Sequence, residues 1–182
     1  MLNQYGLFPP TGGKLKNRLQ LIGVTVQQSR YILENCHYLG RVRVGRQINY
    51  AVMIDGLCDG VITYAYPFTT STISGVLPGE VVEFARLYLL SNIEHSASCA
   101  VGKSLRRIKN DWSYKYKDAK ELKLVVSWSD TTRHKGTIYK ASNFIYDGSK
   151  KVNPRRHLGG VWKNRKDNSD YHNKKDRWLY WL

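Results

Sequence analysis

Helical and strand-like patterns follow one another along this 182-residue chain in an order that few folds share. Apolar residues recur at helical spacing over 26–38, and again from Ser96 or Ser98 to about Asp111, so helices are expected there. The remaining patterns predict strands over 49–54, 61–68, 81–90 and 122–128, a helix over 134–143 and a strand from Phe144. Together they predict an α/β fold with a mixed central β-sheet flanked by helices.

The length is typical of a single domain, here with a basic C-terminal extension. Residues 1–24 are expected to form an irregular lead-in, because paired prolines and glycines interrupt any regular pattern. The core is expected over 25–148. In 149–182 pairs of basic residues alternate with aromatic ones, and we expect this segment to end in a strand that joins the core.

Basic residues outnumber acidic ones by 29 to 14, which gives a formal net charge of +15. Basic side chains displace counterions from phosphate backbones, so this imbalance favours nucleic acid as the partner. Cys36, Cys58 and Cys99 are widely spaced, which argues against a disulfide framework or a zinc cluster. The sequence shows no bilayer-spanning apolar run and no signal-peptide pattern, so we expect a cytoplasmic protein without a membrane partner.

Residues 127–144 concentrate polar side chains at an expected strand-to-helix junction, where α/β folds expose reactive groups. Asp130 follows the strand, and Tyr139 lies in the short helix. Ser127 and Ser129 share one face of the strand, because side chains alternate along it. Such a site on a basic protein indicates an enzyme that acts on nucleic acid.

Three segments carry a resemblance to known proteins. They are His37-Tyr38 after the first helix, Glu83-Phe84-Ala85-Arg86-Leu87-Tyr88 on the third strand, and 127–144. The last of them ends in 137–144, where a tyrosine is followed shortly by a small residue and an aromatic residue. The element order and the last segment resemble the GNAT-like acyltransferase superfamily over roughly 28–146. Within that superfamily the chain resembles the Mom family of phage proteins, which modify adenine in DNA.

This resemblance implies a phage-encoded transferase that attaches a carbamoylmethyl-type group to N6 of adenine in double-stranded DNA. The modification would shield phage DNA from restriction in the host cytoplasm. The target adenine would be flipped out of the helix, because base pairing hides its amino group.

The GNAT-like fold also implies an acyl-CoA or a related donor. GNAT proteins hold its pyrophosphate with a glycine-rich loop before the second long helix, where backbone N–H groups bind anions. A serine-capped helix is the alternative for this chain. At this place the chain has Ser96, Ser98, Ala100 and Lys103, with most of the glycines replaced.

The candidate catalytic residues are Asp130, Tyr139, His37, Arg86, Ser127 and Ser129. Asp130 would accept a proton or orient the amine, or else cap the following helix. Tyr139 matches the general acid of GNAT enzymes, with a core position as the alternative. His37 would act as a base, a base-edge donor or a metal ligand, or would cap its helix. Arg86 would bind a phosphate or carboxylate, or pair with Asp130. The two serines would hydrogen-bond a base or the donor, or line a turn.

Tyr50 and Tyr64 are candidates for stacking on the flipped base, with the core as the alternative. The basic extension is expected to follow DNA through phosphate contacts rather than to be a solvated tail. Its candidate contacts are Lys151, Arg155, Arg156, Lys163, Arg165 and Lys174.

Two other functions remain open at this point. One is an acyl-CoA-dependent N-acyltransferase acting on a protein, an RNA or a small amine. The other is a non-catalytic, basic DNA-binding protein on a transferase scaffold. His37, His95, His134 and Asp130 show no recognised metal-ligand spacing, so the need for a metal stays open, as do the donor, the target sequence and the oligomeric state.

Overall fold

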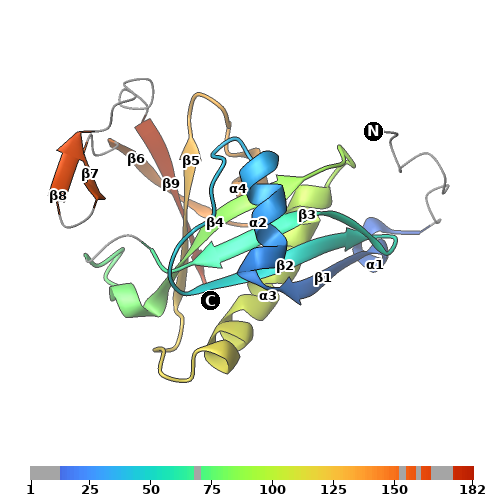
Figure 1. Ribbon diagram of the computed structural model, residues 1–182, viewed down its shortest axis with the longest axis horizontal. Coiled ribbons are helices and arrows are strands. Elements are labelled where there is room, and N and C mark those ends of the chain that lie inside the picture. Colours follow the sequence, from blue (N-terminus) through green and yellow to red (C-terminus); the bar gives the residue numbers. More distant parts are fainter. Residues whose placement is uncertain (1–12, 68–70, 152–154, 159–160, 165–173) are drawn as a thin grey trace. The chain divides into compact units, whose positions relative to one another are not determined.

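The computed structural model describes residues 13–67, 71–151, 155–158, 161–164 and 174–182 (Figure 1). The helices are α1 (Leu15–Arg18), α2 (Val26–Asn35), α3 (Ser96–Lys115) and α4 (Thr137–Ala141), with a 3₁₀ turn at Pro78–Glu80. The strands of the main sheet are β1 (Leu19–Val24), β2 (Gln47–Ile54), β3 (Leu57–Ala65), β4 (Val81–Leu89), β5 (Leu124–Asp130), β6 (Ile145–Lys151) and β9 (Lys174–Trp181). Strands β7 (Arg155–Leu158) and β8 (Val161–Asn164) pair separately.

The main sheet is mixed, with the hydrogen-bonded order β1-β2-β3-β4-β5-β9-β6. Strands β4 and β5 run parallel, whereas β9 is antiparallel to both of its neighbours. The predicted α/β fold with a mixed sheet and flanking helices is therefore confirmed. The chain divides into two compact units, one from 1–66 and 85–119 and one from 67–84 and 120–182, so β4 contributes residues to both.

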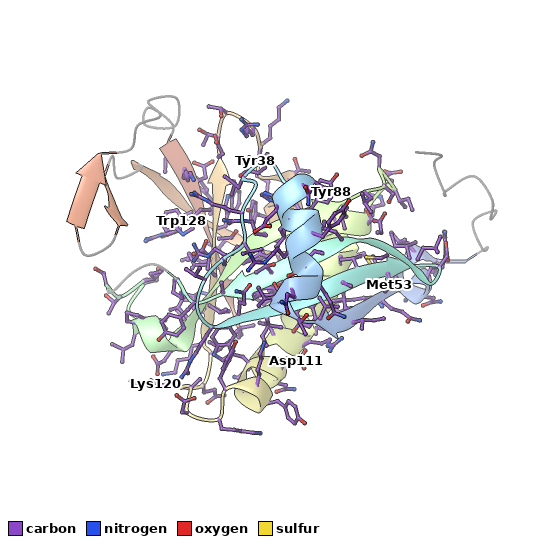
Figure 2. The ribbon with its side chains drawn as sticks, in the orientation of Figure 1. Tyr38, Met53, Tyr88, Asp111, Lys120 and Trp128 are labelled. Atoms are coloured by element: carbon purple, nitrogen blue, oxygen red, sulfur yellow. The ribbon has the colours of Figure 1, made fainter. Side chains whose placement is uncertain are left out.

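In the first unit, helices cover the two faces of β2 and β3 (Figure 1). Helix α2 begins with a capping box, in which Thr25 and Gln28 satisfy each other's backbone N–H groups. On the other face, α3 packs through its buried residues, and its Asp111 accepts a hydrogen bond from the hydroxyl of Tyr50 at 2.7 Å (Figure 2). The apolar stripe of α3 thus anchors this half of the sheet.

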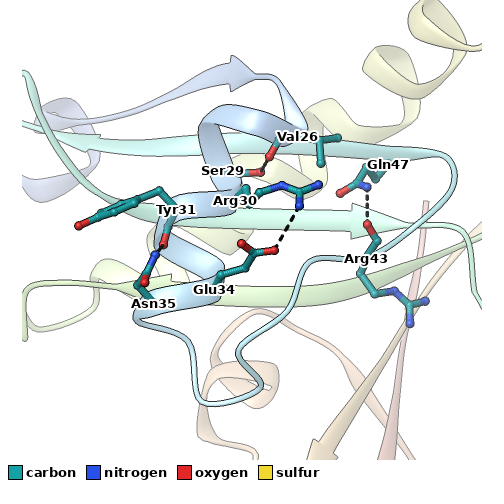
Figure 3. A network of polar contacts seen from close by, with 8 residues as sticks. All are labelled: Val26, Ser29, Arg30, Tyr31, Glu34, Asn35, Arg43 and Gln47. Carbon is teal, nitrogen blue, oxygen red and sulfur yellow. Dashed lines mark hydrogen bonds and ion pairs between the residues drawn. The ribbon is translucent and has the colours of Figure 1, made fainter.

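A buried polar pair lies on the face of β2 and β3 opposite Tyr50. Asn49 and Thr63 are direct cross-strand partners, and the Thr63 hydroxyl donates to Asn49 Oδ1 at 2.7 Å. Gln47 lies on the same face two residues away, and its side-chain amide donates to the carbonyl of Arg43 (Figure 3). Because buried polar groups are costly unless bonded, these contacts fix the register of β2 on β3 and the path of the preceding segment.

The second unit is organised around β5 and β9. Its core joins Val81 of β4, Leu124 and Val126 of β5, and Leu179 of β9, together with Ile73 and Val76 from the segment before β4. Both neighbours of β9 pair with it through long antiparallel registers. The strand expected at the C-terminus is therefore present, and it lies between β5 and β6.

The expectation of an irregular segment over 1–24 is corrected at its C-terminal end. Residues 19–24 form β1, which pairs with β2 along its whole length. Only Leu19 of this strand is fully buried, so the alternation that identifies a strand is weak in its sequence. At the other end of the core, α4 begins at Thr137 rather than at His134.

Gly60 of β3 offers a test of the packing between β3 and β4. A Cβ atom at this position would lie 2.0 Å from the carbonyl oxygen of Tyr88. We expect Gly60→Ala to push the two strands apart and to lower the free energy of unfolding by about 1–3 kcal/mol, measured by urea denaturation. Gly23→Ala is the control, because a Cβ there meets nothing within 4 Å. Equal stability of the two variants would contradict the close approach.

Candidate active site

The end of β5 carries two buried serine hydroxyls on the same face of the strand. Ser127 and Ser129 are both 1% exposed. Ser127 Oγ lies 2.8 Å from the carbonyl oxygen of Phe84 and 3.0 Å from the hydroxyl oxygen of Tyr139. A hydroxyl has one proton, so Ser127 donates to one of these oxygens at a time. Ser127 therefore connects the strand backbone to the phenol of Tyr139.

Trp178 of β9 holds both Tyr139 and Ser129. Its indole ring is stacked on the Tyr139 ring, with centroids 5.1 Å apart and planes 8° from parallel. Its Nε1–H donates to Ser129 Oγ at 2.9 Å. Ser129, expected to bind a base or the donor, thus supports the indole, and its burial leaves it little access to a ligand. The sequence analysis did not identify Trp178 as a site residue, although it noted the aromatic residues of this segment.

Tyr139 is half-buried and surrounded by rings. Phe84 and Phe144 each approach it edge-on, with centroids at 6.2 and 5.5 Å. The stacking on Trp178 and these edge contacts fix the direction of the phenol, while Ser127 contacts its oxygen. This geometry suits a proton donor: once the phenol has released its proton, Ser127 is placed to donate to the phenolate.

A turn connects β5 to α4, and Asp130 fixes it. Asp130 Oδ1 accepts hydrogen bonds from the backbone N–H and the hydroxyl of Thr132, at 3.0 and 2.6 Å. The Asp130 carbonyl accepts from the N–H groups of Arg133 and His134, at 3.1 and 2.9 Å. Asp130 therefore caps this turn. The N–H groups of residues 132–134 are already bonded to Asp130, which explains why α4 starts later than expected.

The carboxyl of Asp130 is nearly buried, and burial alone would raise its pKa. The hydrogen bonds from Thr132 and the charges of Lys175 and Arg133 outweigh burial, so the pKa of Asp130 lies below its ordinary value. The Nε atom of Arg133 is 4.0 Å from Asp130 Oδ2. A carboxylate with a lowered pKa is a weak base at neutral pH but remains a good hydrogen-bond acceptor. At neutral pH the structure thus favours a hydrogen-bond acceptor over a proton-abstracting base at this position, and the catalytic role expected for Asp130 stays a prediction.

His37 and Arg86 belong to the first unit. His37 is buried at the end of α2, stacks on Tyr38 with centroids 4.6 Å apart, and accepts the N–H of Leu39 at Nδ1 (Figure 2). Arg86 is buried on β4 and donates to the carbonyl of Ala85 at 2.6 Å. Each residue therefore has a contact that fits a structural role, and the catalytic roles suggested for them stay predictions.

The expected donor loop forms the start of α3. His95 has a left-handed backbone with φ 63°, and Ser98 Oγ donates to its carbonyl. Ser96 and Ala100 are buried, so only their backbone could meet a donor, whereas Ser98 and Lys103 are half-buried. The first turn carries no acidic residue, so it fits an anionic group such as a pyrophosphate.

Tyr50 and Tyr64 lie in the core of the first unit, at 1% and 0% exposure. Their hydroxyls contact Asp111 and Ser104 of α3, and burial together with the hydrogen bond to Asp111 raises the pKa of Tyr50. The structure thus places both at core positions, where their rings offer no surface to a base.

Among the DNA contacts expected in the extension, Arg165 lies outside the described residues. The others lie on strands: Lys151 on β6, Arg155 and Arg156 on β7, Lys163 on β8, and Lys174 on β9.

The described residues contain no group of three or more His, Cys, Asp or Glu side chains that could hold a metal ion. No helix in the described part of the chain is long and apolar enough to cross a membrane.

The pH dependence of stability tests the state of Asp130. Since its folded pKa is lowered, its carboxylate stabilises the fold above the ordinary pKa near 4, and this contribution is lost as the pH falls through the folded value. We expect wild type to exceed Asp130→Asn in free energy of unfolding by a constant amount at pH 6–8 and by less below pH 4, measured by urea denaturation. Thr132→Val removes one donor and should reduce the difference. A difference that does not change between pH 7 and 3 would contradict a lowered pKa.

Gly136 tests the packing of Trp178 against the start of α4. It has φ 72°, and a Cβ atom there would lie 2.3 Å from the indole. Gly148 is a matched control in the same unit, with φ 80° and nothing within 4 Å of its Cβ position. Both alanine variants carry backbone strain of about 1–3 kcal/mol, and we expect Gly136→Ala to be less stable than Gly148→Ala by about a further 1–3 kcal/mol from overpacking. Equal losses in urea denaturation would show that the indole does not constrain this turn.

Solved structures with the same fold are acetyltransferases. A Bacillus subtilis acetyltransferase in complex with CoA is 10% identical, with a TM-score of 0.54 over 91% of this chain and 98% of that one. RimL, a ribosomal L7/L12 alpha-N-protein acetyltransferase, is 12% identical, with a TM-score of 0.53 over 93% and 96%. A chimera of the spermidine N-acetyltransferase SpeG from Vibrio cholerae and hSSAT is 9% identical, with a TM-score of 0.54 over 90% and 95%. At these identities the matches show the GNAT acetyltransferase fold.

A search of curated proteins gave no match. The model of the Mom protein family, in contrast, matches residues 18–180, which includes β1, the β5–α4 junction and all but the last residue of β9. The chain therefore belongs to the Mom protein family, on a GNAT acyltransferase fold.

Proposed function

We propose that this protein attaches a carbamoylmethyl-type group to N6 of adenine in double-stranded DNA. Membership of the Mom family and the GNAT fold support an acyl-transferase-like enzyme. The observation that carries the proposal is the buried Ser127 hydroxyl at 3.0 Å from the phenol of Tyr139, which itself stacks on Trp178. The modification would protect phage DNA from restriction in the host cytoplasm.

The reaction forms one bond and breaks another, and Tyr139 first gives away one proton and then receives one. The N6 nitrogen forms a bond to the donor's methylene carbon, while the bond from that carbon to the leaving group breaks. Tyr139 gives its proton to the leaving group, and the phenolate accepts a hydrogen bond from Ser127. A proton then passes from N6 to the phenolate, so Tyr139 is neutral again at the end of the reaction. General acid catalysis of this kind contributes typically 10²–10⁴-fold to a rate.

Asp130 takes a different part in this proposal. An adenine amino group is a poor nucleophile, because its lone pair is delocalised into the ring. A carboxylate that accepts one N6 hydrogen would orient the amine and favour attack. The lowered pKa of Asp130 keeps it charged at neutral pH. Its Oδ2 atom would serve as the acceptor, because Oδ1 already accepts two hydrogen bonds from Thr132, while Tyr139 carries the protons. The donor for this step would carry its leaving group directly on the methylene carbon that bonds to N6.

The test is the nucleoside content of DNA from cells that express the protein. We expect a modified deoxyadenosine by mass spectrometry with wild type, and a yield lower by about 10²-fold or more with Tyr139→Phe, which keeps the ring and removes the proton. Tyr146→Phe is the matched control, because Tyr146 is an exposed tyrosine of β6. Unmodified adenine throughout with wild type would refute the proposal.

An N-acyltransferase acting on a protein, RNA or small amine is the second candidate. It is favoured by structural neighbours whose names describe acetyltransferases for a ribosomal protein and for spermidine. Tight binding of coenzyme A without affinity for DNA would support it. A non-catalytic DNA-binding role would be supported if Asp130→Ala and Tyr139→Phe left every cellular phenotype intact.

A further inference from the structure

The turn between β5 and α4, together with α4, carries a group of exposed cationic side chains. Residues 131–135 are all exposed, and they include Arg133 and Lys135; Lys140 on α4 is exposed as well. No acidic residue occurs between Asp130 and Asp147. The segment therefore carries three full positive charges within eight residues, next to Tyr139.

The start of this turn is rigid. Asp130 receives two hydrogen bonds from Thr132 through its carboxylate, and two more from Arg133 and His134 through its carbonyl. The Asp130 side chain is only 8% exposed, and its Oδ1 atom is the one that holds the turn through Thr132, which leaves Oδ2 for the role given to it in the proposed function. The turn thus shows solvent its cations and hydroxyls, while the single acid is used to hold it in shape.

The end of the turn is fixed as well. The backbone of Gly136 is so close to the Trp178 indole that a Cβ would lie 2.3 Å from it. The same indole stacks on Tyr139 and is held by Ser129. The cationic turn and the candidate acid are therefore positioned by one side chain, so a ligand bound by the turn would have a defined place relative to Tyr139.

We infer that this turn, with Arg133, Lys135 and Lys140, binds the phosphodiester backbone of DNA. Long, exposed cations on a rigid turn suit the phosphates of a strand, which position a nucleic acid without reading its sequence. Thr131 and Thr132 are exposed in the same turn as well, and the single hydroxyl proton of Thr132 is donated to Asp130, so the cations carry the expected phosphate contacts. The inference rests on the proposed function, since it takes DNA as the substrate. It assigns the phosphate contacts to this turn in addition to the basic extension.

The salt dependence of DNA binding tests this inference. The variant is Arg133→Ala/Lys135→Ala/Lys140→Ala, and the probe is a fluorescein-labelled 20-base-pair duplex followed by anisotropy at several NaCl concentrations. Each lost phosphate contact lowers the slope of log K against log[salt] by about 0.9, so we expect a slope smaller by about 2–3. The control is Lys14→Ala/Lys16→Ala/Lys117→Ala, which removes the same charge from exposed positions of the first unit and should leave the slope nearly unchanged.

Further variants and outcomes separate the possible results. Arg133→Lys/Lys135→Arg/Lys140→Arg keeps the charges and should keep the wild-type slope, which guards against a folding defect in the alanine variant.

Equal slopes for wild type and the alanine variant would overturn the inference, even if mass spectrometry shows modified adenine. A similar decrease in the control would also overturn it, because only the total charge would then matter. Loss of inorganic pyrophosphate binding with an unchanged DNA slope would assign the turn to the donor instead. Failure of wild type to bind the duplex would overturn the inference together with DNA as substrate.

Discussion

The candidate site depends on the packing of one indole. Trp178 lies on the strand between β5 and β6, so the sheet itself brings it against the hydroxyl face of β5. From there it stacks on Tyr139, donates to Ser129 and fills the space that a side chain at position 136 would need. A large aromatic ring with a single polar N–H suits this task, because the ring packs while the N–H fixes its orientation. The direction of Tyr139 and the shape of the turn after β5 both follow from that packing.

The electrostatics of the site separate two roles that the sequence leaves together. An aspartate and a tyrosine at one junction could each serve as acid or base. The structure surrounds Asp130 with donors and positive charge, which lowers its pKa and makes it a poor proton carrier at neutral pH. Tyr139 instead has a hydroxyl partner and aromatic walls. The arrangement suits Asp130 to accept hydrogen bonds as a carboxylate and Tyr139 to donate a proton.

Periodic patterns were sufficient to predict the sheet and its flanking helices, because long segments such as α3 carry an apolar stripe that only a helix explains. They were insufficient for β1, where a single fully buried leucine leaves almost no alternation. The polar junction at 127–139 was also found from residue types, since Ser127 and Ser129 share a face of one strand. Trp178 was missed as a site residue, because its role depends on a strand that returns from the end of the chain to pair with β5. Pairing between distant segments has no local pattern, so local patterns alone do not reveal it.

The contacts of the acidic residues help to explain where the net positive charge of the protein acts. Arg18, Arg46 and Arg177 each pair with an aspartate: Asp55, Asp118 and Asp147, respectively. Asp111 receives the Tyr50 hydroxyl and also pairs with Arg107, and Asp130 holds its turn. These five of the 14 acidic residues are therefore engaged in fixing local structure. Exposed lysines, together with Arg133 beside Asp130, then contribute to the positive field outside the protein. A polyanion that approaches the β5–α4 turn meets cations on a backbone already held by hydrogen bonds, so less backbone entropy is lost on binding.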